Sequence, residues 1–106
     1  MAALEDLIKG KQGKSAAERL RDLSGKTREQ ARQEFIKEGF EYKGRTPGGY
    51  EKWYHPDDSR VQIRPNGEIV RTGPRKQPEG GGSAYRPRIG PDGKPTPNHN
   101  TGERVE

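Results

Sequence analysis

The stretch EKWYHPDDSRVQIRPNGEIVRTG, residues 51–73, decides the fold, because polar and apolar residues alternate through it on both sides of a turn. This period of two is typical of half-buried β-strands. Asn66 and Gly67 predict a two-residue hairpin loop, since a type I′ turn needs positive φ at both central positions. The resulting register predicts a core face of Val61, Ile63 and Val70 and an open face of Arg60, Gln62, Arg64 and Arg71.

The facing of the preceding strand depends on the length of the loop that begins at Pro56. A four-residue loop, PDDS, places His55, Trp53 and Glu51 on the open face and pairs Glu51 with Arg64. A three-residue loop, PDD, reverses the strand and buries Trp53 against Val61. We favour the four-residue loop because it pairs opposite charges.

Two short helices are predicted before the strands. Ser15 and Thr27 each begin a capping-box pattern, in which the acidic or amide residue three positions later reaches back to the cap. Apolar residues three and four positions apart predict helices over residues 15–23 and 27–38, the second ending at Gly39. Strands are predicted over residues 40–42, 50–55, 59–64 and 68–72. We therefore expect an α+β fold, with one or two N-terminal helices packed on a small twisted antiparallel sheet of three or four strands.

Composition divides the rest of the chain. Residues 1–14 are expected to form a flexible lead-in, with at most a helical fragment over residues 4–8, and residues 15–73 the folded core. Residues 74–106 are rich in Gly and Pro and are not expected to form regular structure, so this C-terminal arm is either a linker or docks on the sheet. Its possible anchors are Tyr85, Ile89 and Val105.

Composition also restricts the core and the chemistry. Leu, Ile, Val and Phe make up 14 of the 106 residues, so the core must be thin. The net charge of +5, with its excess concentrated in residues 41–76, favours anionic partners. Because the chain has no cysteine and only two widely separated histidines, we expect no disulfide, no metal site and no cofactor. No apolar run is long enough to span a bilayer, and the first residues do not resemble a secretion signal.

The open face could bind phosphate. Three arginines on one sheet face can position a phosphate backbone while an aromatic ring stacks on a base. Metal-independent RNA cleavage additionally needs a base for the ribose 2′-OH and an acid for the leaving oxygen. His55, at a strand end, and His99, in the C-terminal arm, are the candidates for these two steps. The alternative is an ordinary solvated face, with His55 as a turn residue and His99 as a tail residue without function.

The segments GGYEKWYHPDDSRVQIRPNGEIVRTGP, residues 48–74, and YRPRIGPDGKPTPNHNTGERV, residues 85–105, carry a resemblance that covers residues 27–106. They resemble the C-terminal toxin domains of bacterial polymorphic toxins of the contact-dependent and Rhs types, among those classed as predicted ribonucleases, such as the type 17 group. The resemblance implies an α+β ribonuclease like those grouped with barnase, RelE and the tRNA-cleaving colicins.

Several expectations follow from this resemblance. The target would be tRNA or ribosomal RNA, and an acidic immunity protein would neutralise the domain. A parent effector polypeptide would precede it, be secreted, and deliver it to the target-cell cytoplasm. The catalytic candidates are His55, Arg60, Arg64, Arg71, Thr72 and His99. The further RNA-binding candidates are Lys43, Arg45, Lys52, Trp53, Arg86 and Arg88.

A second likeness is to HicA-type toxins, carried by EFIKEGF at residues 34–40 and YHPDDSRVQIRP at residues 54–65. In those toxins the catalytic histidine follows a Gly-Ser pair, whereas this chain has Gly49 followed by Tyr50, so their mechanism does not transfer. A rival expectation is a non-catalytic RNA- or protein-binding module that uses the same basic face. A DNA nuclease would be expected to carry a metal cluster, which the sequence does not suggest.

Overall fold

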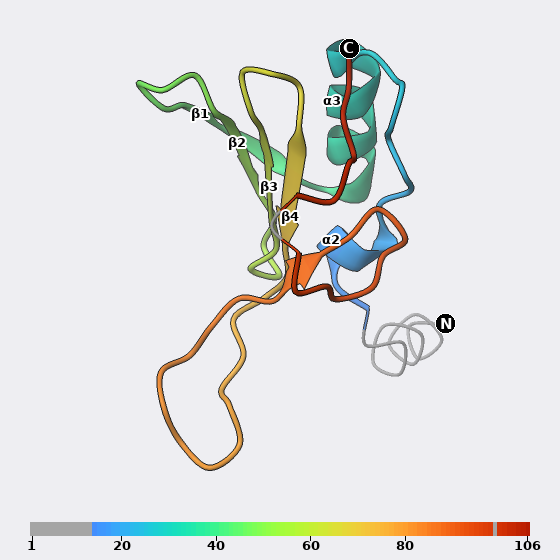
Figure 1. Ribbon diagram of the computed structural model, residues 1–106. Coiled ribbons are helices and arrows are strands. Elements are labelled where there is room, and N and C mark those ends of the chain that lie inside the picture. The colour runs from blue at the N-terminus through green and yellow to red at the C-terminus, as the bar shows by residue number, and fades with distance from the viewer. Residues whose placement is uncertain (1–13, 99) are drawn as a thin grey trace, which may run out of the picture.

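The computed structural model describes residues 14–98 and 100–106, so the predicted lead-in lies almost entirely outside the described residues. Within them the fold is α+β, as predicted, with two helices, α2 (Ala16–Arg19) and α3 (Arg28–Glu38). One antiparallel sheet has the strand order β1-β2-β3-β4-β5, one strand more than expected (Figure 1). Its strands are β1 (Glu41–Arg45), β2 (Glu51–Tyr54), β3 (Arg60–Ile63), β4 (Ile69–Thr72) and β5 (Arg88–Ile89).

Both helices begin with the capping boxes that the sequence predicts. The Ser15 side chain accepts from the backbone of Glu18, and Thr27 does the same for Gln30. Helix α3 ends at Gly39, which has a φ of 100° and closes the helix in the left-handed conformation. Helix α2 is shorter than predicted, because the chain turns to an extended conformation at Leu20.

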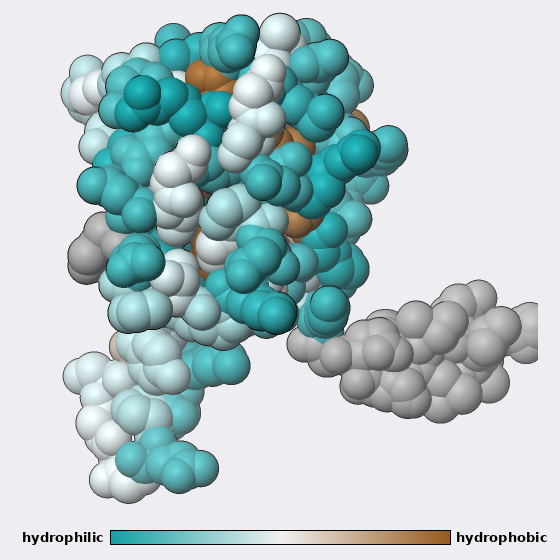
Figure 2. Space-filling view, turned by 45° about the vertical axis from the view of Figure 1, so that its right-hand side comes forward, coloured by the Kyte–Doolittle hydropathy of each residue, from teal (hydrophilic) through white to brown (hydrophobic). Residues whose placement is uncertain are grey.

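Helix α3 packs on one face of the sheet, which we call the helix side. Ala31 and Phe35 of α3 are fully buried there, and the ring of Phe35 lies 5.4 Å from that of Trp53. The core cluster comprises Ala16, Leu20, Leu23, Ala31, Phe35, Phe40, Trp53, Val61, Ile63, Ile69 and Val105. The surface seen in Figure 2 is mostly hydrophilic, with hydrophobic residues visible only in small separate patches.

The predicted register of β3 and β4 is wrong by one residue. Ile63 pairs with Ile69 and Val61 with Arg71, so Pro65, Asn66 and Gly67 form a three-residue loop. Only Gly67 of these has positive φ, whereas a type I′ turn needs it at both central positions. Because side chains alternate, this shift turns Arg71 to the helix side and Val70 to the opposite face, reversing the prediction for both.

The predicted loop after β2 is also wrong, and the three-residue alternative is present. His55 pairs with Ser59 across Pro56, Asp57 and Asp58, and Trp53 lies opposite Val61. Asp58 has a φ of 81°, and the Asp57 carboxylate accepts from the backbone of Ser59 at 2.8 Å, which stabilises the short loop. Trp53 is therefore buried on the helix side.

The expected pair of Glu51 and Arg64 does not form, because Glu51 also turns to the helix side. Its carboxylate accepts from Arg32 of α3 at 2.9 Å, from Arg45 of β1 at 3.2 Å and from the Trp53 indole at 3.1 Å. Burial raises the pKa of Glu51, but these hydrogen bonds outweigh burial and hold the pKa below its usual value. Glu51 thus links α3 to the sheet as a carboxylate.

The C-terminal arm consists of a projecting loop and a docked segment. Residues 74–86 extend away from the body of the molecule (Figure 1), and β5 then pairs with β4. Further on, Glu103 and Val105 are buried beside β4, where the Ile69 amide donates to the Glu103 carbonyl at 2.9 Å. In Figure 1 this last segment runs alongside α3.

A buried ion pair fastens the docked segment. Arg71 donates to both carboxylate oxygens of Glu103, at 3.0 and 2.6 Å, and both side chains are fully buried. The Arg71 guanidinium also donates to the carbonyls of Ala17, Leu20 and Arg21, and Glu103 accepts from the Leu23 amide. The pair therefore joins the sheet, the chain around α2 and the C-terminal segment.

We expect Glu103→Gln to lower the free energy of unfolding by about 3 kcal/mol, because it leaves the buried Arg71 charge without its carboxylate. Denaturant unfolding followed by circular dichroism measures this. Glu106→Gln, at an exposed position three residues on, is the control and should change stability little. A loss below about 1 kcal/mol in the Glu103 variant would show that the arm is not anchored by this pair.

We also expect acid to weaken the fold through Glu51. Its pKa is lower in the folded than in the unfolded chain, so its contribution is complete above the ordinary glutamate pKa and is lost as pH falls through the folded value. Glu51→Gln should be less stable than the wild type near pH 7, and the difference should shrink as pH falls below about 4. Thermal unfolding across this range measures both, and a constant difference would contradict the assignment.

Candidate nucleic-acid interface

The sheet face opposite the helix carries side chains in rows that cross the strands, and we call it the basic face. The first row is Arg88, Thr72, Arg60 and Tyr54. The second row is Val70, Gln62 and Lys52. At the hairpin end, the backbone amide of Arg64 donates to the Glu68 carbonyl at 2.8 Å. This hydrogen bond pairs the two residues, so Arg64 and Glu68 form a third row.

Cations lie over aromatic rings on this face. The Arg60 guanidinium is 4.6 Å from the centre of the Tyr54 ring, and the Lys52 ammonium is 5.9 Å from the same ring. The Arg64 guanidinium lies 5.8 Å from the ring of Tyr50. Within the described part of the chain, neither Arg60 nor Lys52 forms an ion pair, so their charges remain available to an anionic ligand.

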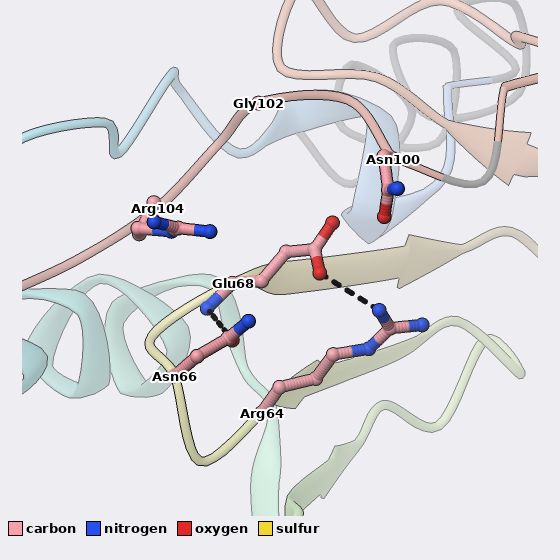
Figure 3. A pocket seen from close by; sticks show the side chains of 6 residues that line it. All are labelled: Arg64, Asn66, Glu68, Asn100, Gly102 and Arg104. Carbon is pink, nitrogen blue, oxygen red and sulfur yellow. Dashed lines mark hydrogen bonds and ion pairs between the residues drawn. The ribbon is translucent and has the colours of Figure 1, made fainter.

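A pocket of about 520 Å³ lies at the hairpin end of the basic face. Arg64, Asn66 and Glu68 line it from the hairpin, and Asn100, Gly102 and Arg104 line it from the C-terminal segment. Figure 3 shows Arg64 and Asn100 near the Glu68 carboxylate, with Arg104 on the C-terminal segment nearer the backbone end of the Glu68 side chain. The pocket exists only because the C-terminal segment docks against the hairpin.

Glu68 is the central polar group of this pocket. It is only 7% exposed, and Arg64 donates to its Oε1 oxygen at 2.7 Å (Figure 3). The Asn66 side chain accepts from the Glu68 amide at 2.9 Å, which fixes the backbone of the turn. Among the described residues, the Arg64 Nε is buried without a hydrogen-bond partner. A carboxylate that is paired with one guanidinium group, in a pocket that a second one also lines, can accept a proton while these groups stabilise negative charge that develops nearby.

Several sequence-predicted residues do share the basic face. Arg60, Arg64 and Thr72 lie on it, and so do Lys52 and Arg88. Lys43 lies at its β1 edge, beside Glu41 at 3.4 Å. Arg86 lies just before β5, where its guanidinium donates to the Asp58 carboxylate at 3.0 Å.

Other predicted site residues lie on the helix side, which corrects their assignment. Arg71 is fully buried against Glu103 and cannot reach a ligand on the basic face. Trp53 is 6% exposed, in contact with Phe35, and Arg45 pairs with Glu51 on the same side. The one-residue register shifts described above account for the positions of Arg71 and Trp53.

His55 is likewise held within the fold. Its Nε2 lies 3.0 Å from the Glu38 carbonyl, and its Nδ1 accepts from the Asp57 amide at 3.0 Å. The ring packs edge-on against Phe40 at 5.2 Å. Both ring nitrogens of His55 are thus engaged within the fold, on the helix side and not on the basic face. His99 lies outside the described residues, directly before Asn100 in the sequence.

Tyr54, Glu68 and Asn100 also belong to this face and its pocket, although no sequence pattern singled them out. Because side chains alternate along a strand, the four-residue loop favoured above would turn Tyr54 to the core side. Glu68 follows the hairpin turn, so its proximity to Arg64 could have been found from the strand pairing alone. Asn100 reaches the pocket only through the docking of the C-terminal segment, which no local pattern indicates.

Comparison of the chain with protein-family models, with curated proteins and with solved structures finds no match. Within residues 14–98 and 100–106, no helix has the length and apolar character needed to cross a membrane. In the same residues, no three His, Asp or Glu side chains converge into a group that could hold a metal ion.

We expect His55→Ala to lower the free energy of unfolding by about 1–3 kcal/mol, because it leaves two buried backbone groups without partners. Its affinity for a labelled single-stranded oligonucleotide should stay within about twofold of the wild type, measured by fluorescence anisotropy at a temperature where the variant is folded. The neighbouring Tyr54→Ala, which alters the basic face, should instead weaken binding about tenfold. Equal effects of the two variants on binding would contradict the placement of His55.

Proposed function

We propose that this chain is a metal-independent endoribonuclease toxin domain of an interbacterial competition effector, and that it cleaves tRNA or ribosomal RNA. The observation that carries the proposal is the Glu68 carboxylate, which accepts from Arg64 at 2.7 Å in a pocket that Arg104 also lines, at the end of a basic sheet face. Cleavage next to a ribose 2′-OH needs a base, cations and a positioned phosphate, and these residues supply the first two.

The basic face supports RNA binding ahead of the pocket. Arg60 and Lys52 offer charge for phosphates, and the Tyr54 ring, which lies against both cations, holds them in place on the face. Both groups stand on strands whose backbone positions are fixed by the sheet ladder. An RNA strand that crosses these rows, along the direction of the β-strands, would reach the Glu68 pocket at the hairpin end.

Glu68 is the proposed general base of the reaction. Its Oε2 oxygen has no hydrogen-bond partner among the described residues, so it can take the proton of the 2′-OH. The 2′-oxygen then forms a bond to the adjacent phosphorus, and the bond from phosphorus to the 5′-oxygen of the next nucleotide breaks. Arg64 and Arg104 stabilise the charge on the phosphate during this exchange. The leaving oxygen takes up a proton, for which His99 is the sequence candidate.

The biological setting of the proposal comes from the resemblance to polymorphic toxins. A parent effector would precede this domain, be secreted, and bring it into the cytoplasm of a target cell. An acidic immunity protein would then neutralise it by covering the basic face. Arg60 and Lys52, which form no ion pair with the described residues, support a partner of opposite charge.

A non-catalytic RNA- or protein-binding module is the alternative. It is favoured by the engagement of both ring nitrogens of His55 within the fold. It predicts binding that weakens steeply with salt and yields no cleaved product.

The test is incubation of the folded domain with total RNA and with purified tRNA in EDTA. We expect cleavage that leaves 2′,3′-cyclic phosphate ends, and we expect Glu68→Gln to lower the rate by at least about a hundredfold, because loss of a general base has that effect. Glu41→Gln is the matched control, since it neutralises an exposed carboxylate at the edge of the same face.

The outcomes distinguish the two readings. Intact RNA after incubation with a well-folded wild type that still binds RNA would support the binding module. Full activity of Glu68→Gln would remove Glu68 from the mechanism. His99→Ala, assayed in parallel, is expected to slow cleavage about a hundredfold if it supplies the proton to the leaving oxygen.

A further inference from the structure

A second groove lies at the other end of the basic face, between residues 85–88 and residues 95–97. Its volume is about 450 Å³, within the range of sites that hold small organic groups. The apolar part of its lining is Tyr85, Pro87, Pro95 and Pro97, and the basic part is Arg86 and Arg88. The lining therefore combines flat apolar surfaces with positive charge.

The walls of this groove are held by backbone contacts. The amides of Lys76 and Tyr85 each donate to the other residue's carbonyl, at 2.7 and 2.9 Å. The Gly73 amide donates to the Pro87 carbonyl, and the Thr96 amide to the Arg88 carbonyl, both at 2.9 Å. Proline rings add stiffness because they fix φ. The groove is thus formed before any ligand arrives, which lowers the cost of binding.

The Tyr85 ring is not part of the hydrophobic core. Tyr85 is 51% exposed, among the most exposed of the large hydrophobic residues described. Its backbone is nevertheless fixed at the base of the projecting loop by its bridge to Lys76. An aromatic ring on a fixed backbone that faces solvent beside prolines is suited to stack on another flat ring.

The groove is continuous with the basic face. Arg88 lies opposite Thr72, in the same row as Arg60 and Tyr54. Along β4 this row is four residues from Glu68, which at the rise of an extended strand is about 13 Å. A nucleic-acid strand that has a phosphate in the Glu68 pocket and runs along the face would therefore pass this groove.

We infer that the groove between residues 85–88 and 95–97 binds one unpaired nucleobase of the RNA, stacked on Tyr85, so that the domain selects single-stranded substrate. Bases in a duplex are paired and stacked on their neighbours and cannot enter such a groove without being unstacked. Every base offers a flat face to an aromatic ring, so stacking on Tyr85 does not depend on which base is bound. This inference rests on the proposed function, because it takes RNA to be the ligand of the basic face.

The experiment measures binding separately from cleavage. The probe is a fluorescein-labelled oligonucleotide of mixed sequence with 2′-O-methyl riboses, which cannot be cleaved by 2′-OH attack, used as a single strand and as the matching duplex. We expect Tyr85→Ala to weaken single-strand binding about tenfold and duplex binding less than twofold, and Tyr85→Phe to bind like the wild type. Tyr42→Ala is the control, because Tyr42 is 52% exposed at the opposite edge of the sheet.

Each outcome decides the inference. Equal losses of single-strand and duplex binding in Tyr85→Ala, or no loss at all, would overturn it, as would a wild type that binds neither probe. If Tyr85 is needed for single-strand binding but the wild type cleaves no RNA, the groove stands and the endoribonuclease proposal fails. If RNA is cleaved normally by Tyr85→Ala and its single-strand affinity is unchanged, the groove assignment fails alone.

Discussion

The buried ion pair of Arg71 and Glu103 is the interaction on which the rest of the structure depends. Removing two charges from water is costly, and here the cost is offset because both groups have several further partners. Arg71 binds three backbone carbonyls around α2, and Glu103 accepts from the Leu23 amide. Those carbonyls belong to the short helix and to the two residues after it, so the same contacts that satisfy the guanidinium also fix the chain where α2 ends.

The position of Arg71 also determines the character of the opposite face. With Arg71 turned inward, Val70 and Thr72 turn outward and join Arg60 and Lys52. Two glutamates, Glu51 and Glu103, are used inside the fold as partners for arginines. These two carboxylates therefore do not offset the charges of Arg60 and Lys52 on the basic face.

The sequence predicted features that depend on near neighbours. The caps at Ser15 and Thr27, the extent of α3 and the presence of the four main strands all follow from local patterns. The register of the strands could not be predicted from local patterns. One extra residue in a loop turns every side chain of the next strand to the other face of the sheet, and the turn at Asn66 and Gly67 allows two loop lengths.

The candidate site was only partly predictable for the same reason. The basic character of the face was predicted, and Arg60 and Arg64 lie on it. Arg71 was misplaced because full burial of an arginine is rare and depends on Glu103, 32 residues away. Half of the pocket comes from the C-terminal segment, whose Gly- and Pro-rich composition indicates no regular structure and gives no sign of where it docks.

Glu103 lies far in the sequence from its partners, and this separation affects the order in which parts of the protein can fold. The contact of Leu23 with Glu103 spans 80 residues. Arg71 pairs with the same carboxylate, which follows it by 32 residues in the sequence. During synthesis on the ribosome, the helices and the hairpins emerge before the segment that neutralises Arg71. Until residues 103–105 have left the ribosome, Arg71 has no carboxylate and the Glu68 pocket lacks one wall. Translation itself thus delays completion of the pocket until almost all of this sequence has been made.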